Sequence, residues 1–285
     1  MIHFGSFRWA AIAGTGAALF AACIGPIVRA HFWRRAAPPD EYVGVVPFLD
    51  DEERAVRVQG KRSLLIGGTR GVGYGTALAL AKAGSHVTIV GRSEQSGMKA
   101  VKRIQSELSR SKHATGASVE FLQGDLGTVC DALKLVRTLE AKVSDQNRRY
   151  DFLIVTAATF PDWSQPLKNV DGVEKSFAIA VVGRFLIYRN MHRFMESKFR
   201  VLNVLASGVT SIALPLNREI VSGVRNVKGL MEAVMTFALG NEIMLESLFK
   251  HDPNIASRVT MVSTHPGLLK TGMYIPLRRS DIKAL

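Results

Sequence analysis

Cysteine is scarce in this sequence, with only two among 285 residues. Cys23 lies in an apolar segment and Cys130 in a stretch of helical pattern, so no disulfide framework is expected and a reducing compartment is favoured. Metal-ligand spacings are also missing, because His192, His251 and His265 stand far apart in the sequence. The sequence therefore predicts neither a disulfide-stapled secreted domain nor a metal site.

Acidic residues are missing from the first part of the chain, where none precedes Asp40. Here the segment Trp9–Val28 carries no charge and is long enough for a helix to cross a bilayer. Small residues recur along it at four-residue spacing, which suits close packing against another membrane helix; they are Ala10, Gly14, Ala18 and Ala22. More basic residues follow the segment than precede it, so the rest of the chain should stay on the cytosolic or matrix side.

We therefore expect a single-pass membrane protein, with the mitochondrial inner membrane as the favoured location and the endoplasmic reticulum as the alternative. A cleaved secretory signal is the competing interpretation, although the apolar run is long for one. The expected partners are the membrane itself and either other subunits of a membrane complex or a second copy of the chain.

Nucleic acid is not an expected partner, despite a formal net charge of +13. Such an excess could serve nucleic acid, an anionic membrane face or an anionic ligand. No basic-aromatic cluster, helix-turn-helix pattern or zinc spacing accompanies it, so a solvated basic surface is the preferred interpretation.

The chain is predicted to fall into three parts: a membrane anchor or targeting segment over 1–35, a linker over 36–57, and a folded domain over 58–285. Strands and helices alternate in the third part, which predicts an α/β fold: a Rossmann-type doubly wound parallel sheet that follows an N-terminal transmembrane helix. The expected strands are 63–66, 86–90, 119–122, 152–157, 201–205 and 259–262. The expected long helices are roughly 94–112, 127–146, 172–197 and 223–250.

A glycine-rich turn stands between the first expected strand and a helix over 77–83. Its glycines, Gly67, Gly71 and Gly73, follow the apolar run 63–66. Glycines let the backbone turn sharply and approach a pyrophosphate closely, and a helix N-terminus adds unpaired N–H groups with a positive dipole end. The strand, turn and helix together predict a dinucleotide site.

Basic residues stand where such a site would select its cofactor. The second strand ends at Arg92 and Ser93, where an NAD site would carry an acidic residue for the ribose hydroxyls. Arg70 can reach from the glycine turn, and two guanidinium groups suit a 2′-phosphate. We predict that the site binds NADP(H) rather than NAD(H). The alternative is that the two arginines are ordinary surface residues with no role in binding.

Several motifs taken together resemble the short-chain dehydrogenases/reductases. They are the glycine turn, Gly124-Asp125-Leu126, the helix start 171–178 and the segment His265–Thr271. The resemblance implies that Asp125 and Leu126 lie at the adenine, and that Pro266, Gly267 and Thr271 line the nicotinamide end. The predicted cofactor-binding residues are Gly67, Thr69, Arg70, Gly71, Val72, Gly73, Arg92, Ser93, Asp125, Leu126, Ala157, Lys228, Pro266, Gly267 and Thr271.

The same resemblance implies a catalytic set of Tyr, Lys, Ser and Asn, from which this sequence departs. In place of Tyr-x-x-x-Lys stand Val224 and Lys228, so the lysine is present and the proton donor is missing. Ala180 occupies the position of the helix Asn, and the serine is either replaced by Ala206 or displaced by one residue to Ser207. Lys228 and Ser207 are the remaining catalytic candidates.

These departures predict a membrane-anchored NADP(H)-binding protein with a degenerate catalytic tetrad, acting as a non-catalytic accessory subunit of a mitochondrial membrane complex. The alternative is an NADPH-dependent oxidoreductase that reduces a lipid-like carbonyl with Ser207, Lys228 and an unrecognised donor.

Overall fold

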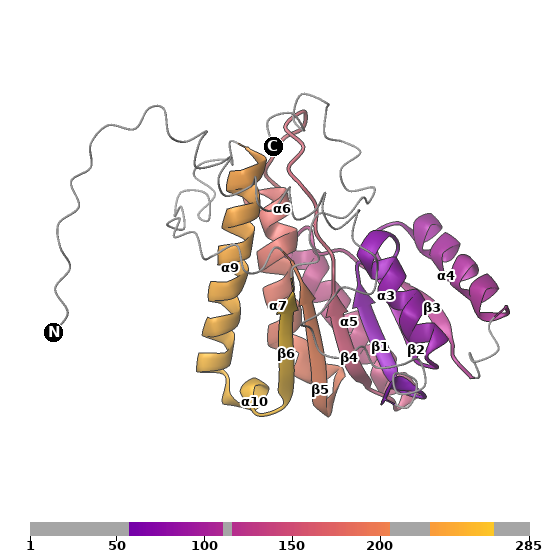
Figure 1. The fold of residues 1–285 in the computed structure, drawn as a ribbon. Helices are drawn as coiled ribbons and strands as arrows, with labels where there is room; N and C mark the ends of the chain where they lie inside the picture. Colours follow the sequence, from indigo (N-terminus) through magenta and orange to yellow (C-terminus); the bar gives the residue numbers. More distant parts are fainter. Residues whose placement is uncertain (1–56, 111–115, 206–228, 265–285) are drawn as a thin grey trace, which may run out of the picture. The chain divides into compact units, whose positions relative to one another are not determined.

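The computed structural model describes residues 57–110, 116–205 and 229–264 of the chain. Within these residues, six parallel strands form one sheet in the order β3-β2-β1-β4-β5-β6 (Figure 1). The strands are β1 Arg62–Ile66, β2 His86–Gly91, β3 Val119–Gln123, β4 Tyr150–Val155, β5 Met195–Val204 and β6 Val259–Thr264. The strand order reverses between β1 and β4, so the predicted doubly wound parallel sheet is confirmed.

Helices cover both faces of this sheet. On one face pack α3 (Gly71–Lys82) and α4 (Glu94–Leu108); on the other pack α5 (Val129–Gln146), α7 (Arg184–Asn190) and α9 (Leu230–His251) (Figure 1). Neighbouring residues of a strand face opposite sides. Leu64 accordingly belongs to the core under α5, α7 and α9, whereas Leu65 belongs to the core under α3 and α4. The sheet is therefore the middle of three layers.

Four short elements complete the described part of the chain. They are α6 (Lys175–Phe177), the π-helical η2 (Ala178–Gly183), the 3₁₀-helical η3 (Met191–Arg193) and α10 (Pro253–Ala256). The first two run directly into α7, so α6, η2 and α7 form one continuous helical segment with a π-helical middle.

The helix predicted over 172–197 ends earlier than expected, and that part of the prediction is wrong. Helical structure stops at Arg193, and β5 already begins at Met195. The error has a physical cause: Met191, Phe194, Met195 and Phe199 are all buried, and their spacing imitates the apolar face of a helix. Pairing of Tyr150 with Met195 draws this segment into the sheet instead.

The expectation of a single-pass membrane protein is corrected by the structure. No helix in the described ranges is both long and apolar enough to cross a bilayer. Trp9–Val28, from which that expectation was drawn, lies outside the described residues, as do the predicted segment 1–35 and almost all of the predicted linker.

Candidate nucleotide site

The glycine-rich turn links the end of β1 to the start of α3, as the sequence predicts. Gly67 has a positive φ of 99°, and its N–H donates to the carbonyl oxygen of Val90 at 2.9 Å. A Cβ at Gly67 would lie 2.5 Å from the backbone nitrogen of Ala157, and one at Gly73 would lie 2.4 Å from the Gly67 carbonyl oxygen. The backbone therefore comes closer here than any side chain would allow, which fits a turn shaped for a phosphate group.

The residue after β4 fastens this turn to the neighbouring strand. The Thr156 hydroxyl donates to the Gly67 carbonyl oxygen at 3.1 Å, and the Ala157 N–H donates to the Ile66 carbonyl oxygen at 3.0 Å. Ala157, a predicted cofactor residue, thus lies against the turn. The turn sits at the switch point between β1 and β4, where open α/β sheets bind their ligands.

The basic residues predicted to select the cofactor are exposed around this turn. Arg70 precedes α3 and Arg92 follows β2, and both side chains are open to solvent. Arg92 is steadied through its carbonyl oxygen, which accepts from the Gln123 side-chain amide at 2.9 Å. Neither guanidinium is tied up in an ion pair among the described residues, so both can bind a phosphate.

Ser93 has a structural role that the sequence prediction missed. Its side-chain oxygen accepts from the Ser96 N–H at 3.2 Å and so caps the N-terminus of α4. The hydroxyl proton can still be donated to a ligand. Thr69 packs in the same region, since a Cβ at Gly91 would lie 2.7 Å from its methyl carbon.

Asp125 follows β3 in a conformation held by its own neighbours. Its Oδ1 accepts from the N–H groups of Leu126 at 2.7 Å and Gly127 at 3.0 Å. Leu126 itself is buried in the core. The geometry leaves Oδ2 of Asp125 available to accept a hydrogen bond at the carboxyl edge of the sheet.

A buried polar network lies at the carboxyl ends of β4 and β5. Ala180 lies fully buried in η2, and its carbonyl oxygen accepts from the Asn241 side-chain amide at 3.2 Å. Asn203 of β5 donates to Asn241 Oδ1 at 2.7 Å and to Ser263 Oγ at 3.0 Å. π-helical turns such as η2 often occur at functional sites.

Arg184 and Tyr188 complete this network, and sequence reasoning assigned Arg184 no role. Arg184 Nη1 donates to Asn203 Oδ1, and Nη2 donates to the carbonyl oxygens of Ala157 and Val204 at 2.9 Å each. The Tyr188 hydroxyl also donates to Asn203 Oδ1, at 2.8 Å, and burial raises the pKa of Tyr188 to about 12. Arg184 is the charged residue inside the otherwise apolar run 177–188, and this feature of the sequence could have identified it as a candidate.

The remaining predicted residues cannot be placed. Ser207, Lys228, Pro266, Gly267 and Thr271 lie outside the described residues, and so do Ala206 and Val224. Their roles stay predictions.

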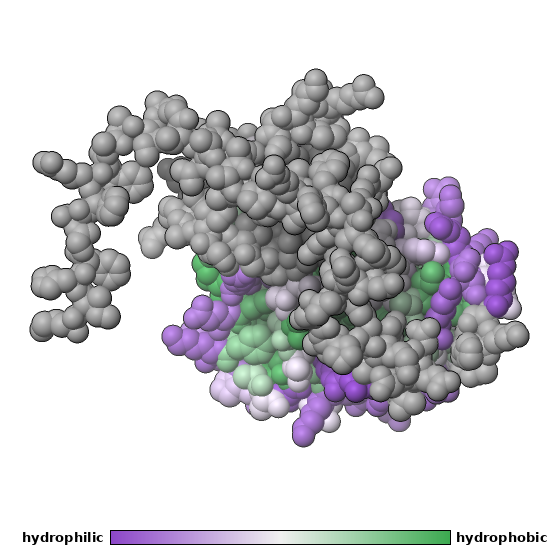
Figure 2. All heavy atoms as spheres, in the orientation of Figure 1, coloured by the Kyte–Doolittle hydropathy of each residue, from purple (hydrophilic) through white to green (hydrophobic). Residues whose placement is uncertain are grey.

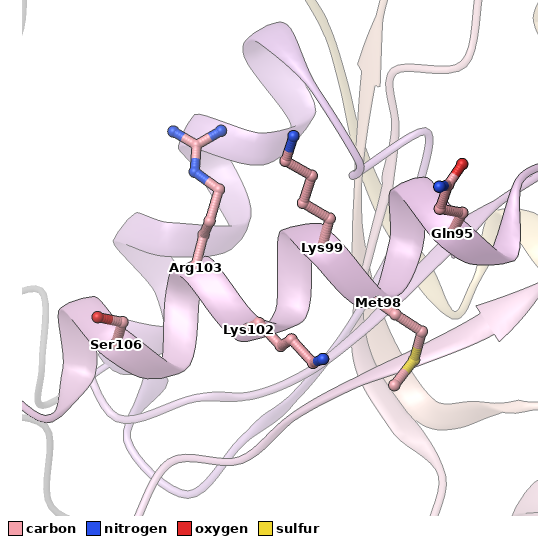
Figure 3. Close-up of a pocket in the computed structure, with 6 residues that line it drawn as sticks. All are labelled: Gln95, Met98, Lys99, Lys102, Arg103 and Ser106. Carbon is pink, nitrogen blue, oxygen red and sulfur yellow. The ribbon is translucent and has the colours of Figure 1, made fainter.

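A hollow of about 490 Å³ lies elsewhere, on the outer surface of α4 (Figure 3). Gln95, Met98, Lys99, Lys102, Arg103 and Ser106 line it. Arg103 lies over the ring of Tyr74, with 4.8 Å between its guanidinium carbon and the ring centroid. Hydrophilic side chains gather over α4 (Figure 2). None of the predicted cofactor residues lines this hollow, and its open, basic character is that of a solvated surface.

The model of one protein family, described as short chain dehydrogenase, matches residues 61–213. This chain belongs to the short-chain dehydrogenase family. A polyprenol dehydrogenase of Danio rerio is 32% identical over 130 residues, which are 45% of this chain and 36% of that protein. The short-chain dehydrogenase/reductase prx1 of Penicillium roqueforti is 27% identical over 183 residues, 62% of this chain and 49% of the relative. The chain thus spans less than half the length of either relative.

Solved structures share the fold. The MalC reductase/Diels-Alderase from Malbranchea aurantiaca superposes with a TM-score of 0.59 at 18% identity, over 81% of each chain. An angucycline C-6 ketoreductase, LanV, solved with bound NADP, gives 0.56 at 18% identity over 80% of each chain. At such low identity the likeness shows the fold alone.

Proposed function

We propose that this protein binds NADP(H) and transfers hydride weakly or not at all. The observation that carries the proposal is the pairing of a tight glycine turn with two exposed arginines. A Cβ at Gly67 or Gly73 would collide with backbone atoms, so the turn fits a close backbone approach to phosphate. Arg70 and Arg92 then supply positive charge for a 2′-phosphate.

Each part of the site has a role in this proposal. The first turn of α3 receives the pyrophosphate, the Asp125 carboxylate accepts at the adenine, and Ser93 adds a hydroxyl donor beside Arg92. The segment from Pro266 to Thr271 and the Lys228 ammonium would hold the nicotinamide end. When bound, NADPH supplies a hydride; the chain's own residues would have to supply the proton.

No proton donor has been identified for this site. Val224 cannot donate a proton, and the buried Ala180 has no side-chain amide. Loss of a positioned acid typically lowers a rate by about 10²–10⁴-fold. A protein with this site would therefore oxidise bound NADPH slowly, which suits an accessory subunit of a larger complex or a homodimer.

A second candidate function is reduction of a lipid-like carbonyl with NADPH. Supporting it are the names of two relatives, the polyprenol dehydrogenase above and a human retinol dehydrogenase 13, which is 27% identical over 132 residues. In this case Ser207 would bind the carbonyl oxygen and Lys228 would support a donor that the sequence does not identify.

Turnover separates the two candidates. NADPH oxidation by the purified chain is followed by the absorbance of the reduced nicotinamide ring, with a panel of isoprenoid and straight-chain aldehydes and ketones. The first candidate predicts binding of NADPH with no oxidation above background. Rapid oxidation that Lys228→Ala abolishes would replace it with the second, whereas Lys228→Ala should change only NADPH affinity if the first is right.

A further inference from the structure

Arg184 carries a full positive charge into the protein interior. It opens α7 directly after η2, and its side chain is fully buried. Burial lowers the pKa of Arg184, because a desolvated guanidinium is disfavoured, but arginine keeps its proton in proteins. Buried charges are normally paired with an opposite charge, so the surroundings of Arg184 need an explanation.

Among the described residues, the hydrogen-bond partners of Arg184 are all neutral. They are the amide oxygen of Asn203 and the backbone oxygens of Ala157 and Val204. The Tyr188 hydroxyl, which shares the Asn203 oxygen, has a pKa of about 12 and is uncharged at neutral pH. Arg184 Nε has no hydrogen-bond partner, and no ion pair joins Arg184 to an acidic residue in the described ranges. Neutral hydrogen-bond acceptors surround this positive charge, and no carboxylate in the described part of the chain neutralises it.

This charge lies behind the edge of the sheet where the cofactor is proposed to bind. The two backbone oxygens bound by Nη2 belong to Ala157, just past the end of β4, and to Val204, the last residue of β5. The carboxyl ends of these central strands form the crevice in which open α/β sheets hold their ligands. The Ala157 N–H is bonded to the last residue of β1, so the guanidinium and the glycine turn contact the same short segment.

We propose that Arg184 makes this site prefer the reduced cofactor, NADPH, over NADP⁺. The inference rests on the proposed function, because it requires that the crevice binds NADP(H) at all. The oxidised nicotinamide ring carries a positive charge that the reduced ring lacks, and a fixed buried guanidinium repels that charge. The rest of the cofactor is the same in both redox states, so the repulsion appears directly in their ratio of affinities.

The expected size of the effect follows from Coulomb's law. Two unit charges about 12 Å apart at an effective dielectric constant of about 20 interact strongly enough to change a dissociation constant roughly tenfold. A nicotinamide site with this charge behind it retains NADPH and releases NADP⁺. It is thus better suited to hold a reduced cofactor than to catalyse oxidation of an alcohol by NADP⁺.

Asn203→Asp provides the test, because it places a carboxylate directly against the Arg184 guanidinium with little change of shape. Dissociation constants for NADPH and NADP⁺ are measured on the full chain, the first by cofactor fluorescence and the second by competition. We expect the wild-type chain to bind NADPH about tenfold more tightly than NADP⁺. The Asn203→Asp chain should bind the two nearly equally. Tyr188→Phe, which removes a hydrogen bond to the same Asn203 oxygen without a change of charge, should keep the wild-type ratio.

The outcomes are separable. A wild-type chain that binds both cofactors equally overturns the inference and leaves the proposed function standing, and this needs no variant. A wild-type chain that binds neither overturns both. An unchanged ratio in Asn203→Asp assigns Arg184 a structural role only. If Asn203→Asp does not fold, Arg184→Gln removes the charge while keeping an amide donor, and it should lower the ratio by the same factor.

Discussion

The two halves of the sheet differ in where their arginine side chains lie: exposed to solvent in one half and buried in the other. In the half built from β1, β2 and β3, the arginines at the glycine turn are exposed, and the backbone of the turn is tightly packed. In the half built from β4, β5 and β6, an arginine is buried among amides and backbone oxygens. The first arrangement can attract an anion from solvent, whereas the second can only act through its field.

The largest expected effect comes from filling the closest backbone approach in the first half. Gly73→Ala would place a Cβ 2.4 Å from the Gly67 carbonyl oxygen and push the turn out of position. Overpacking of this kind costs about 1–3 kcal/mol, so NADPH affinity should fall by up to about 100-fold, as measured by fluorescence titration. Gly75→Ala is the matched control, because nothing lies within 4 Å of its Cβ position. Equal losses in both variants would show that the turn does not hold the cofactor.

An effect of comparable size that is confined to one cofactor is expected from Arg92→Ala. Arg92 is exposed and its backbone is held by Gln123, so the fold should be unaffected. A hydrogen bond to a charged group contributes about 1.5–3 kcal/mol, which predicts about 10–100-fold weaker NADPH binding. NADH lacks the 2′-phosphate and should bind as before. Equal losses for the two cofactors would refute the assignment of the 2′-phosphate to this arginine.

The smallest expected effect concerns stability in the first half, away from the cofactor. Burial alone would raise the pKa of Glu120, but hydrogen bonds from Thr88 and Lys142 lower it below its usual value of 4.5. A carboxyl with a lowered folded-state pKa stabilises the fold above pH 4.5, and that contribution is lost as pH falls through the folded-state pKa.

Urea unfolding of the wild type and of Glu120→Gln, compared between pH 7 and pH 3, measures this contribution. The free energy of unfolding of Glu120→Gln should fall less steeply with acid. Glu174, in the second half, supplies the contrast: burial raises the pKa of Glu174, so its share of the stability increases as pH falls. A parallel acid slope for wild type and Glu120→Gln would contradict the proposed role of Glu120.

The sequence predicted best those features that depend on backbone geometry, namely the glycine turn and the strands. Glycine spacing located the turn at Gly67 and Gly73, because only glycine permits backbone contacts this close. The apolar runs located the strands for a similar reason, since strands of a parallel sheet are buried on both faces. The exception was the start of β5, where the spacing of Phe194, Met195 and Phe199 satisfies a helix and a strand core equally well.

The buried network could not be predicted from spacing. Arg184 follows Gly183 in an apolar helix, and the sequence alone does not reveal whether an arginine there extends to solvent or turns inward. Of its three oxygen partners, two belong to β5 and one to Ala157, just past β4, and they lie 19 to 27 residues away in the chain. Only the sheet order brings them together. Contacts between distant segments decide the electrostatics of this half, whereas local motifs decide the shape of the other.

A titration of the 285-residue chain with NADPH, followed by the fluorescence of the reduced ring, tests the central claim most directly. The site described above predicts saturable binding of one NADPH per chain, with the bound cofactor still reduced when the titration ends. Fluorescence that rises without saturation, as for NADPH free in buffer, would contradict it.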